Sequence, residues 1–156
     1  ALFARALGGI ASDRIAKVRG LDGRTLLLFV LMIGEGLGLL WWSQMDSVAI
    51  AVVAMLTFGL FTHMACGATY ALVPFIDRSA LGGGAGIIGA GGNVGAVAAG
   101  FLMKASPDTQ SCLLILGGLV TVSAVCAVAV RFSAEHKSQE KQLFEQAVAE
   151  RQALAA

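Results

Sequence analysis

Charged residues are scarce in this sequence. They make up 13% of the 156 residues, whereas a soluble domain carries about 25%, and 57% of the residues are apolar. Such a composition excludes an ordinary soluble domain. It also excludes a disordered chain, because disorder requires low hydrophobicity and high net charge. The 11 basic and 10 acidic residues leave a net charge of +1, so the sequence predicts no nucleic-acid partner. We therefore expect the apolar residues to face lipid.

Cysteine is rare as well, and two familiar hydrolase motifs are missing. Cys66, Cys112 and Cys126 lie singly in apolar runs, without the close spacing of a zinc or redox site. We therefore expect reduced packing residues and no metal or other cofactor. Neither Gly-x-Ser-x-Gly nor His-Glu-x-x-His occurs, which makes an enzyme the least favoured class. The sequence starts with Ala inside an apolar segment, without a basic leader and cleavage site, which predicts a fragment of a longer protein.

Long apolar runs bounded by polar clusters dominate the chain. A helix needs ~20 residues to cross a hydrocarbon core ~30 Å thick. Four runs reach this length and an incomplete one begins the chain; they cover residues 1–12, 25–42, 48–75, 81–103 and 112–130. Because these runs are continuous, without alternating polarity, we expect helices and not strands. The sequence predicts an all-α polytopic membrane helix bundle over residues 1–131.

Basic residues are distributed unevenly around the apolar runs. The linker after residue 42 has none, and the linker after residue 103 has only Lys104. By the positive-inside rule, the other linkers and the end of the chain belong on the cytoplasmic side. The basic residues assigned to that side are Arg14, Lys17, Arg19, Arg24, Arg78, Arg131, Lys137, Lys141 and Arg151.

The polar segment at residues 132–156 is predicted to be a cytoplasmic helical tail. Its apolar residues recur at helical spacing: Leu143, Phe144, Ala147, Val148 and Leu154. This pattern fits an amphipathic helix resting on the protein or membrane surface. It also fits a solvated, fraying helix, which is the interpretation we favour.

Arg5 is an ionised residue placed deep in the membrane. It precedes Asp13 by eight residues, or ~12 Å along a helix. An ionised arginine at the bilayer centre costs ~3 kcal/mol on insertion scales, so such residues usually face a pathway, ligand or counter-charge. Its planar, paired donors suit a flat oxyanion. The structural alternative is a side chain that snorkels to the interface or pairs with an acid elsewhere.

Glu35 is the second ionisable residue within a span, and it lies between Gly34 and Gly36. It is a candidate for proton coupling or for pairing with a cation. Equally, it fits a protonated carboxyl group that only hydrogen-bonds to a neighbouring helix. His63 lies within the next run, where we expect a neutral, hydrogen-bonded imidazole.

Glycine is concentrated at residues 81–100, LGGGAGIIGAGGNVGAVAAG, where nine residues are glycine. In lipid such a segment stays helical, because each backbone group needs an internal partner. Small residues at four-residue spacing then create grooves for a helix or a small ligand. Asn93 could offer an amide donor there, although an interhelical hydrogen bond explains it as well. Gly84, Gly86 and Gly89 match G-x-G-x-x-G, but a membrane span is the wrong context for a dinucleotide site.

Three stretches resemble known transporters. Residues 3–14, FARALGGIASDR, resemble the loop motif of the major facilitator superfamily, Gly-x-x-x-Asp-Arg. Residues 65–75, ACGATYALVPF, and residues 89–97, GAGGNVGAV, are similar to the nitrate/nitrite porter family, and the second of these is the more specific. The resemblance covers residues 1–131. It implies the C-terminal part of a twelve-span major facilitator fold, from the end of span eight to span twelve.

This resemblance implies a secondary active transporter of nitrate and/or nitrite that works by alternating access in the plasma membrane. Arg5 matches the family's substrate-binding arginine. The residues expected to complete the binding site are Asn93, Gly91, Gly92 and Gly95. The residues expected to form a conformational latch are Gly9, Asp13 and Arg14. Proton symport and nitrate/nitrite exchange both remain open, and Glu35 is a weak candidate for proton coupling.

Two alternatives stay open at the level of function. One is a major facilitator transporter of another small anion or solute, and the other, ranked lowest, is a membrane enzyme. A second intramembrane arginine in the other half of a transporter would favour nitrate. The expected partners are therefore nitrate or nitrite, protons and the lipid bilayer; an accessory membrane protein is not identified by the sequence.

Overall fold

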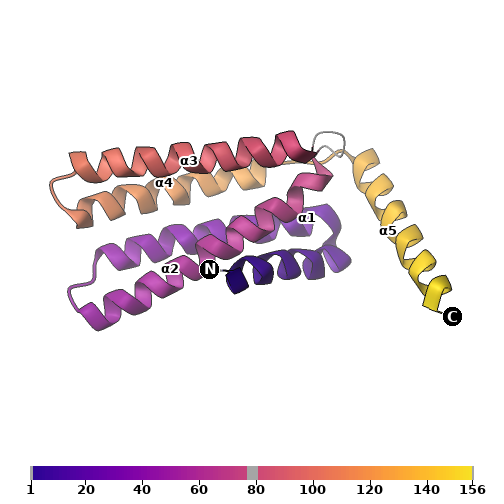
Figure 1. Cartoon of the computed structure of the whole chain (residues 1–156), viewed down its shortest axis with the longest axis horizontal. Helices are drawn as coiled ribbons and strands as arrows, with labels where there is room; N and C mark the ends of the chain where they lie inside the picture. The colour runs from indigo at the N-terminus through magenta and orange to yellow at the C-terminus, as the bar shows by residue number, and fades with distance from the viewer. Residues whose placement is uncertain (1, 77–80, 156) are drawn as a thin grey trace.

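Helices make up every regular element of the chain. The structure, a computed structural model, describes residues 2–76 and 81–155. Over these residues it contains helices and no strand, which confirms the all-α prediction (Figure 1). The elements are α1 (Leu2–Ser43), α2 (Val48–Leu72), η1 (Val73–Phe75), α3 (Leu81–Ala105), α4 (Thr109–Ala129) and α5 (Ala134–Ala155).

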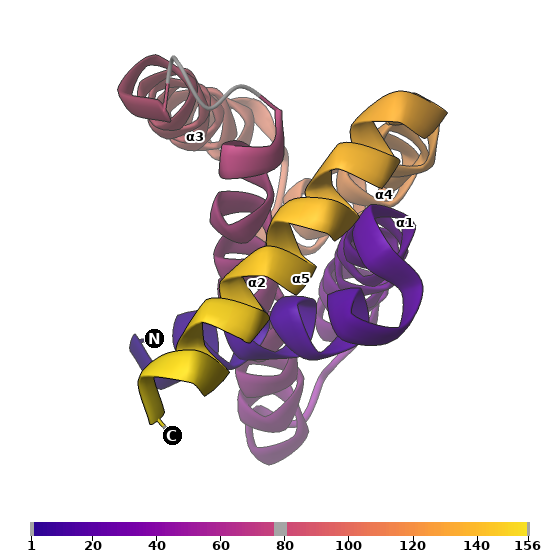
Figure 2. The same cartoon turned by 90° about the vertical axis from the view of Figure 1, so that its right-hand side faces the viewer.

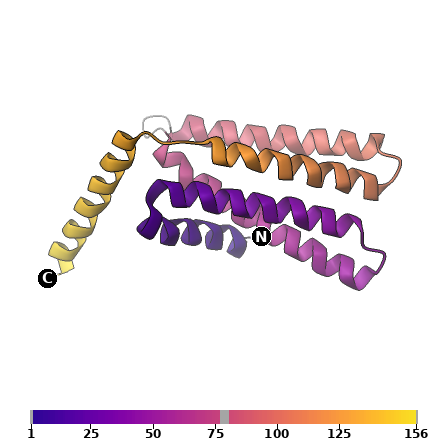
Figure 3. The same ribbon diagram turned by 180° about the vertical axis from the view of Figure 1, so that it is seen from behind.

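Helix α1 is divided at Gly20 into two arms. Gly20 has φ 62° and ψ −148°, a left-handed conformation that glycine adopts without the steric cost of a Cβ atom. The first arm, residues 2–19, and the second, residues 21–43, lie side by side (Figures 1 and 3). The polar linker expected at residues 13–24 is therefore mostly helical. No glycine or proline occurs between residues 10 and 19, so nothing stops the helix before Gly20.

Four helices are long and apolar enough to cross a membrane within the described part of the chain. They are the stretch Phe3–Ser43 of α1, Val48–Phe75, Leu81–Ala105 and Thr109–Ala129. Each complete apolar run of the sequence forms most of one of these helices or of the second arm of α1. This agreement follows from a simple constraint, because a helix satisfies all its backbone hydrogen bonds internally.

Helix α1 is the centre of the packing. Its second arm packs Leu31 against Ala65 and Ala68 of α2 in a small buried cluster. Its other neighbour is α4, where Gly36 meets Thr121. Small residues dominate these contacts, as expected where helices associate in lipid through close packing. Helix α3, by contrast, contains no buried residue and lies at the edge of the bundle, where it makes a few contacts with α4 and with η1 (Figure 1).

The chain reversals fall at two opposite ends of the bundle. The Gly20 turn, η1 and the junction between α4 and α5 share one end, which we call the basic end (Figure 1). The linkers at residues 44–47 and 106–108 lie at the other end. The basic linkers before Thr25 and after Val130 thus gather on the same side of the bundle, as the charge pattern predicts.

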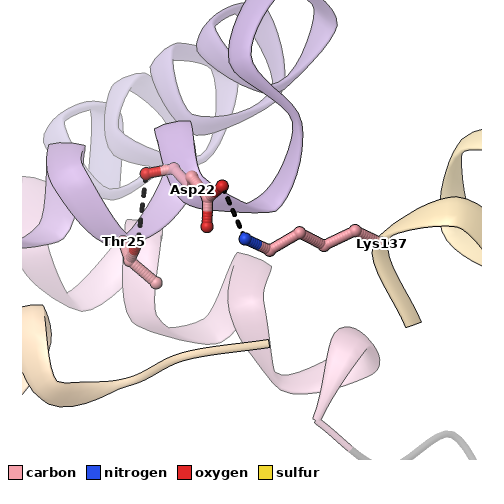
Figure 4. A network of polar contacts seen from close by, with 3 residues as sticks. All are labelled: Asp22, Thr25 and Lys137. Carbon is pink, nitrogen blue, oxygen red and sulfur yellow. Dashed lines mark hydrogen bonds and ion pairs between the residues drawn. The ribbon is translucent and has the colours of Figure 1, made fainter. Parts of the chain in front are cut away.

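Helix α5 lies across the basic end (Figure 2). Lys137 Nζ is 2.7 Å from Asp22 Oδ2, next to Thr25, whose hydroxyl donates to the Asp22 carbonyl (Figure 4). The ring nitrogen of His136 is 2.8 Å from the Phe75 carbonyl oxygen. The helical tail that we favoured as solvated and fraying is therefore anchored at its first turn.

Candidate functional site

Arg5 opens onto a cleft between three helices. The cleft has a volume of about 490 Å³. Its walls come from the first arm of α1, from α2 and from the glycine-rich α3; the lining residues are Arg5, Cys66, Thr69, Tyr70, Ile88, Gly89, Gly92 and Asn93. Among the described residues of this lining, Arg5 alone carries a charge. The cleft therefore presents a cationic surface to a ligand.

The position of Arg5 is determined by a close backbone approach between α1 and α2. A Cβ atom at Gly67 would overlap the Arg5 carbonyl oxygen, and one at Gly8 would overlap that of Met64. The two glycines therefore let the helices touch at the backbone. This contact fixes the register of α1 along α2 and holds Arg5 beside Cys66 and the residues one turn further.

Helix α3 contributes Gly89, Gly92 and Asn93, which share one face because they are three and four residues apart. A Cβ atom at Gly92 would meet nothing within 4 Å. The backbone of α3 is therefore open to a small ligand at this point, with the Asn93 amide on the next residue.

The structure brings together three of the five residues predicted to bind substrate. Arg5, Gly92 and Asn93 line the same cleft, although Arg5 lies more than eighty residues from the other two in sequence. Gly91 and Gly95 are exposed on α3 and do not line it. Helical geometry explains the position of Gly91, because residue 91 points about 100° away from residue 92. Gly95 is three residues from Gly92 and therefore shares its face, but it lies outside the lining of the cleft.

Three lining residues of α2 were missed by sequence reasoning. Cys66, Thr69 and Tyr70 lie within ACGATYALVPF, the stretch whose resemblance was noted without assigning any role to its side chains. The resemblance was thus the available signal. Which of its residues face the cleft depends on how α2 is rotated against α1, and local sequence does not specify that rotation.

Glu35 lies outside the cleft, in the second arm of α1. Its carboxyl group lies near Thr62 of α2, whose hydroxyl donates to the Phe58 carbonyl at 3.0 Å. The flanking glycines again mark close contacts, because a Cβ at Gly34 would strike the Phe61 ring and one at Gly36 would strike Thr121. Glu35 is therefore held at the interface of three helices, away from Arg5.

The predicted latch residues have different surroundings from those expected. Asp13 pairs with Arg24 at 2.8 Å, while Arg14 is exposed and has no ion pair with any described residue. Gly9, expected to permit a close approach, would have no atom within 4 Å of an added Cβ. The close approach occurs at the neighbouring Gly8 because that residue faces α2.

Arg24 is the residue at the basic end that sequence reasoning undervalued. It was counted only as a basic linker residue, yet it is 8% exposed. Its guanidinium donates to Ser12 Oγ at 2.9 Å, pairs with Asp13 and lies 4.6 Å from the centre of the Phe75 ring. Only the fold reveals this cluster, because its members come from three separate segments.

Comparison with known proteins places these observations in a family context. The chain is 36% identical to high affinity nitrate transporter 2.5 of Arabidopsis thaliana over 122 residues, 78% of the chain. It is 41% identical to nitrate transporter 2.2 of Chlamydomonas reinhardtii over 99 residues, 61% of the chain. It is also 38% identical to nitrate/nitrite transporter NrtP of Picosynechococcus sp. over 100 residues, 62% of the chain.

The matched region is a limited part of each relative. It spans 24%, 19% and 18% of the length of these three proteins. No protein-family model matches the chain, and no solved structure matches it significantly. The similarity therefore concerns a segment of these relatives.

Proposed function

We propose a function for this chain from its membership of the nitrate/nitrite porter family of the major facilitator superfamily. The protein transports nitrate and/or nitrite, and the Arg5 cleft is one wall of its substrate site. One observation carries the proposal: Arg5 shares a cleft with Gly92 and Asn93 of the glycine-rich helix. The other half of the transporter would supply the opposite wall, as in facilitators that bind substrate between two halves near the membrane midplane.

The chemistry of the cleft suits a small planar anion. Arg5 supplies a positive charge and paired donors in one plane, which match two oxygens of nitrate or nitrite. The Asn93 amide adds a neutral donor, and the absence of a side chain at Gly92 lets the anion approach the backbone. A single positive charge in the lining favours an anion over a neutral solute.

Alternating access would then depend on the basic end. We propose that this end faces the cytoplasm of a cell whose plasma membrane holds the protein, and that Gly9, Asp13 and Arg14 belong to a latch favouring one conformation. In this chain Asp13 is oriented by Arg24, so Arg24 is part of the same device. The open faces of Gly91 and Gly95 would let α3 slide against the other half.

The test is nitrate uptake by the full-length protein in a transport-deficient cell. Arg5→Lys keeps the charge and removes the planar paired donors, so we expect uptake to fall by about tenfold or more at equal surface abundance. Arg19→Lys is the matched control, because Arg19 is exposed and lies outside the cleft. Its uptake should equal that of the wild type.

Two results would contradict the proposal. If transport-deficient cells that express the wild-type protein take up neither nitrate nor nitrite, the proposed substrate is wrong. Wild-type uptake that is unchanged in Arg5→Lys would reject the role of Arg5 and return it to a structural function.

A further inference from the structure

We propose that Tyr70 is an additional anion-binding residue, whose neutral hydroxyl donates a hydrogen bond to the substrate held by Arg5. This inference rests on the proposed function, because it concerns a further residue of the same cleft. It assigns a role to α2, which no sequence motif had linked to substrate binding.

The position of Tyr70 supports this role. Tyr70 lines the cleft and is 41% exposed. Its hydroxyl oxygen would lie 3.7 Å from a Cβ atom built on Gly89. The phenol therefore extends from α2 to the glycine face of α3, close to the face that carries Gly92 and Asn93.

Tyr70 and its neighbour Thr69 differ in whether the hydroxyl proton is already used in a hydrogen bond. The Thr69 hydroxyl already donates its single proton to the Ala65 carbonyl at 2.8 Å, so it has none left for an anion. Tyr70 makes no hydrogen bond to any residue in ranges 2–76 and 81–155. Its phenolic proton is therefore available to a ligand in the cleft.

The donor geometry complements Arg5. Arg5 lines the cleft from α1, whereas the Tyr70 hydroxyl lies beside Gly89 of α3. An anion between them would be bound from two directions, so that its orientation is defined as well as its charge. A neutral phenol adds this direction without a second fixed charge, and the bound anion can still leave.

Tyr70→Phe in the full-length protein isolates the hydroxyl, because phenylalanine keeps the ring. We expect the KM for nitrate to rise about tenfold, the loss of one hydrogen bond to an ion, with the maximal rate per molecule largely kept. KM does not depend on how much protein reaches the membrane. Thr57→Val is the matched control, because it removes a hydroxyl that is bonded to Val53 on the same helix, away from the cleft.

Cys66 provides a second measurement that needs no turnover. It lines the cleft as a free, partly exposed thiol, so bound nitrate should protect it from a methanethiosulfonate reagent. Modification of the Cys66 peptide is quantified by mass spectrometry at rising nitrate concentrations. The half-protecting concentration should rise by the same factor as KM in Tyr70→Phe.

The outcomes separate this inference from the proposed function. A sharp loss of uptake in Arg5→Lys, together with unchanged KM and unchanged protection in Tyr70→Phe, would overturn the role of Tyr70 and leave the transporter assignment intact. A lower maximal rate with unchanged half-protection would also overturn it, because Tyr70 would then act on conformation. A wild type without nitrate uptake or protection would overturn both.

Discussion

Arg24 shows how one buried side chain organises the basic end. Its guanidinium binds Ser12 and Asp13 from the first arm of α1 and stacks on Phe75 of η1. Among the buried side-chain nitrogen and oxygen atoms of the described residues, only Arg24 Nε has no hydrogen-bond partner. The residue thus joins both arms of α1 to the segment that leads into α3.

Replacing Arg24 with Ala should destabilise this end. The substitution leaves the buried Ser12 hydroxyl without its donor and removes the contact with Phe75. We expect a loss of about 2 kcal/mol in stability, typical of a hydrogen bond to a charged group in a buried setting. A thermal unfolding curve of the purified full-length protein measures this loss. Arg19→Ala serves as control, and equal midpoints for the two variants would contradict the prediction.

Glu35 provides a test of coupling at a single residue. Glu35→Gln keeps the size and polarity of the side chain near Thr62 but cannot exchange a proton. If Glu35 carries the coupled proton, the variant should bind nitrate normally and lose nitrate-driven proton uptake, measured with a pH electrode on cells or proteoliposomes. Proton uptake equal to that of the wild type would assign Glu35 a packing role.

At the scale of elements, the contact between α1 and α2 decides whether the cleft forms. Two glycines allow it from opposite sides, since Gly8 faces the Met64 carbonyl and Gly67 faces the Arg5 carbonyl. A methyl group at either position meets backbone, which cannot move aside as a flexible side chain can. The helices must separate, and Arg5 then shifts relative to Tyr70.

Gly67→Ala should therefore impair transport strongly, although the substitution adds only one methyl group. We expect uptake to fall by about tenfold or more per molecule at the surface, because small displacements of a binding group cost large factors. Gly59→Ala is a matched control on α2, since a Cβ there would meet nothing within 4 Å. Similar uptake by the two variants would show that the close approach does not position Arg5.

At the scale of the whole molecule, the basic end and the opposite end are the two faces on which topology depends. Basic residues flank the Gly20 turn and the junction of α4 with α5, and the positive-inside rule places such segments in the cytoplasm. The side of the membrane stays a prediction. It is accessible to experiment because both ends carry exposed serines.

Cysteines introduced at these serines should report opposite sides once the native Cys66, Cys112 and Cys126 are replaced by Ala. Ser138→Cys on α5 and Ser47→Cys before α2 both place a thiol at an exposed position. In intact cells, a membrane-impermeant maleimide should label residue 47 and reach residue 138 only after permeabilisation. The reverse pattern would invert the topology. Equal labelling of both would contradict the spans between them.

The sequence alone determined the class of the protein and its elements. Apolar runs of membrane-spanning length became helices because lipid leaves the backbone no other way to satisfy its hydrogen bonds. Arg5 and Asn93 were also identifiable from the sequence, since an ionised residue and a lone amide stand out within apolar segments. These inferences depend on local composition, which can be read directly from the sequence.

Only the tertiary structure decided which of these residues meet. Cys66, Thr69 and Tyr70 of α2 line the cleft, and which residues of α2 do so depends on how this helix is rotated against α1. Gly8, and not Gly9, makes the close contact with α2 for the same reason. Arg24 gains its partners from segments that Gly20 folds back on each other. Such contacts arise from packing between distant helix faces, and the spacing of residues along one helix does not specify which face a neighbour will cover.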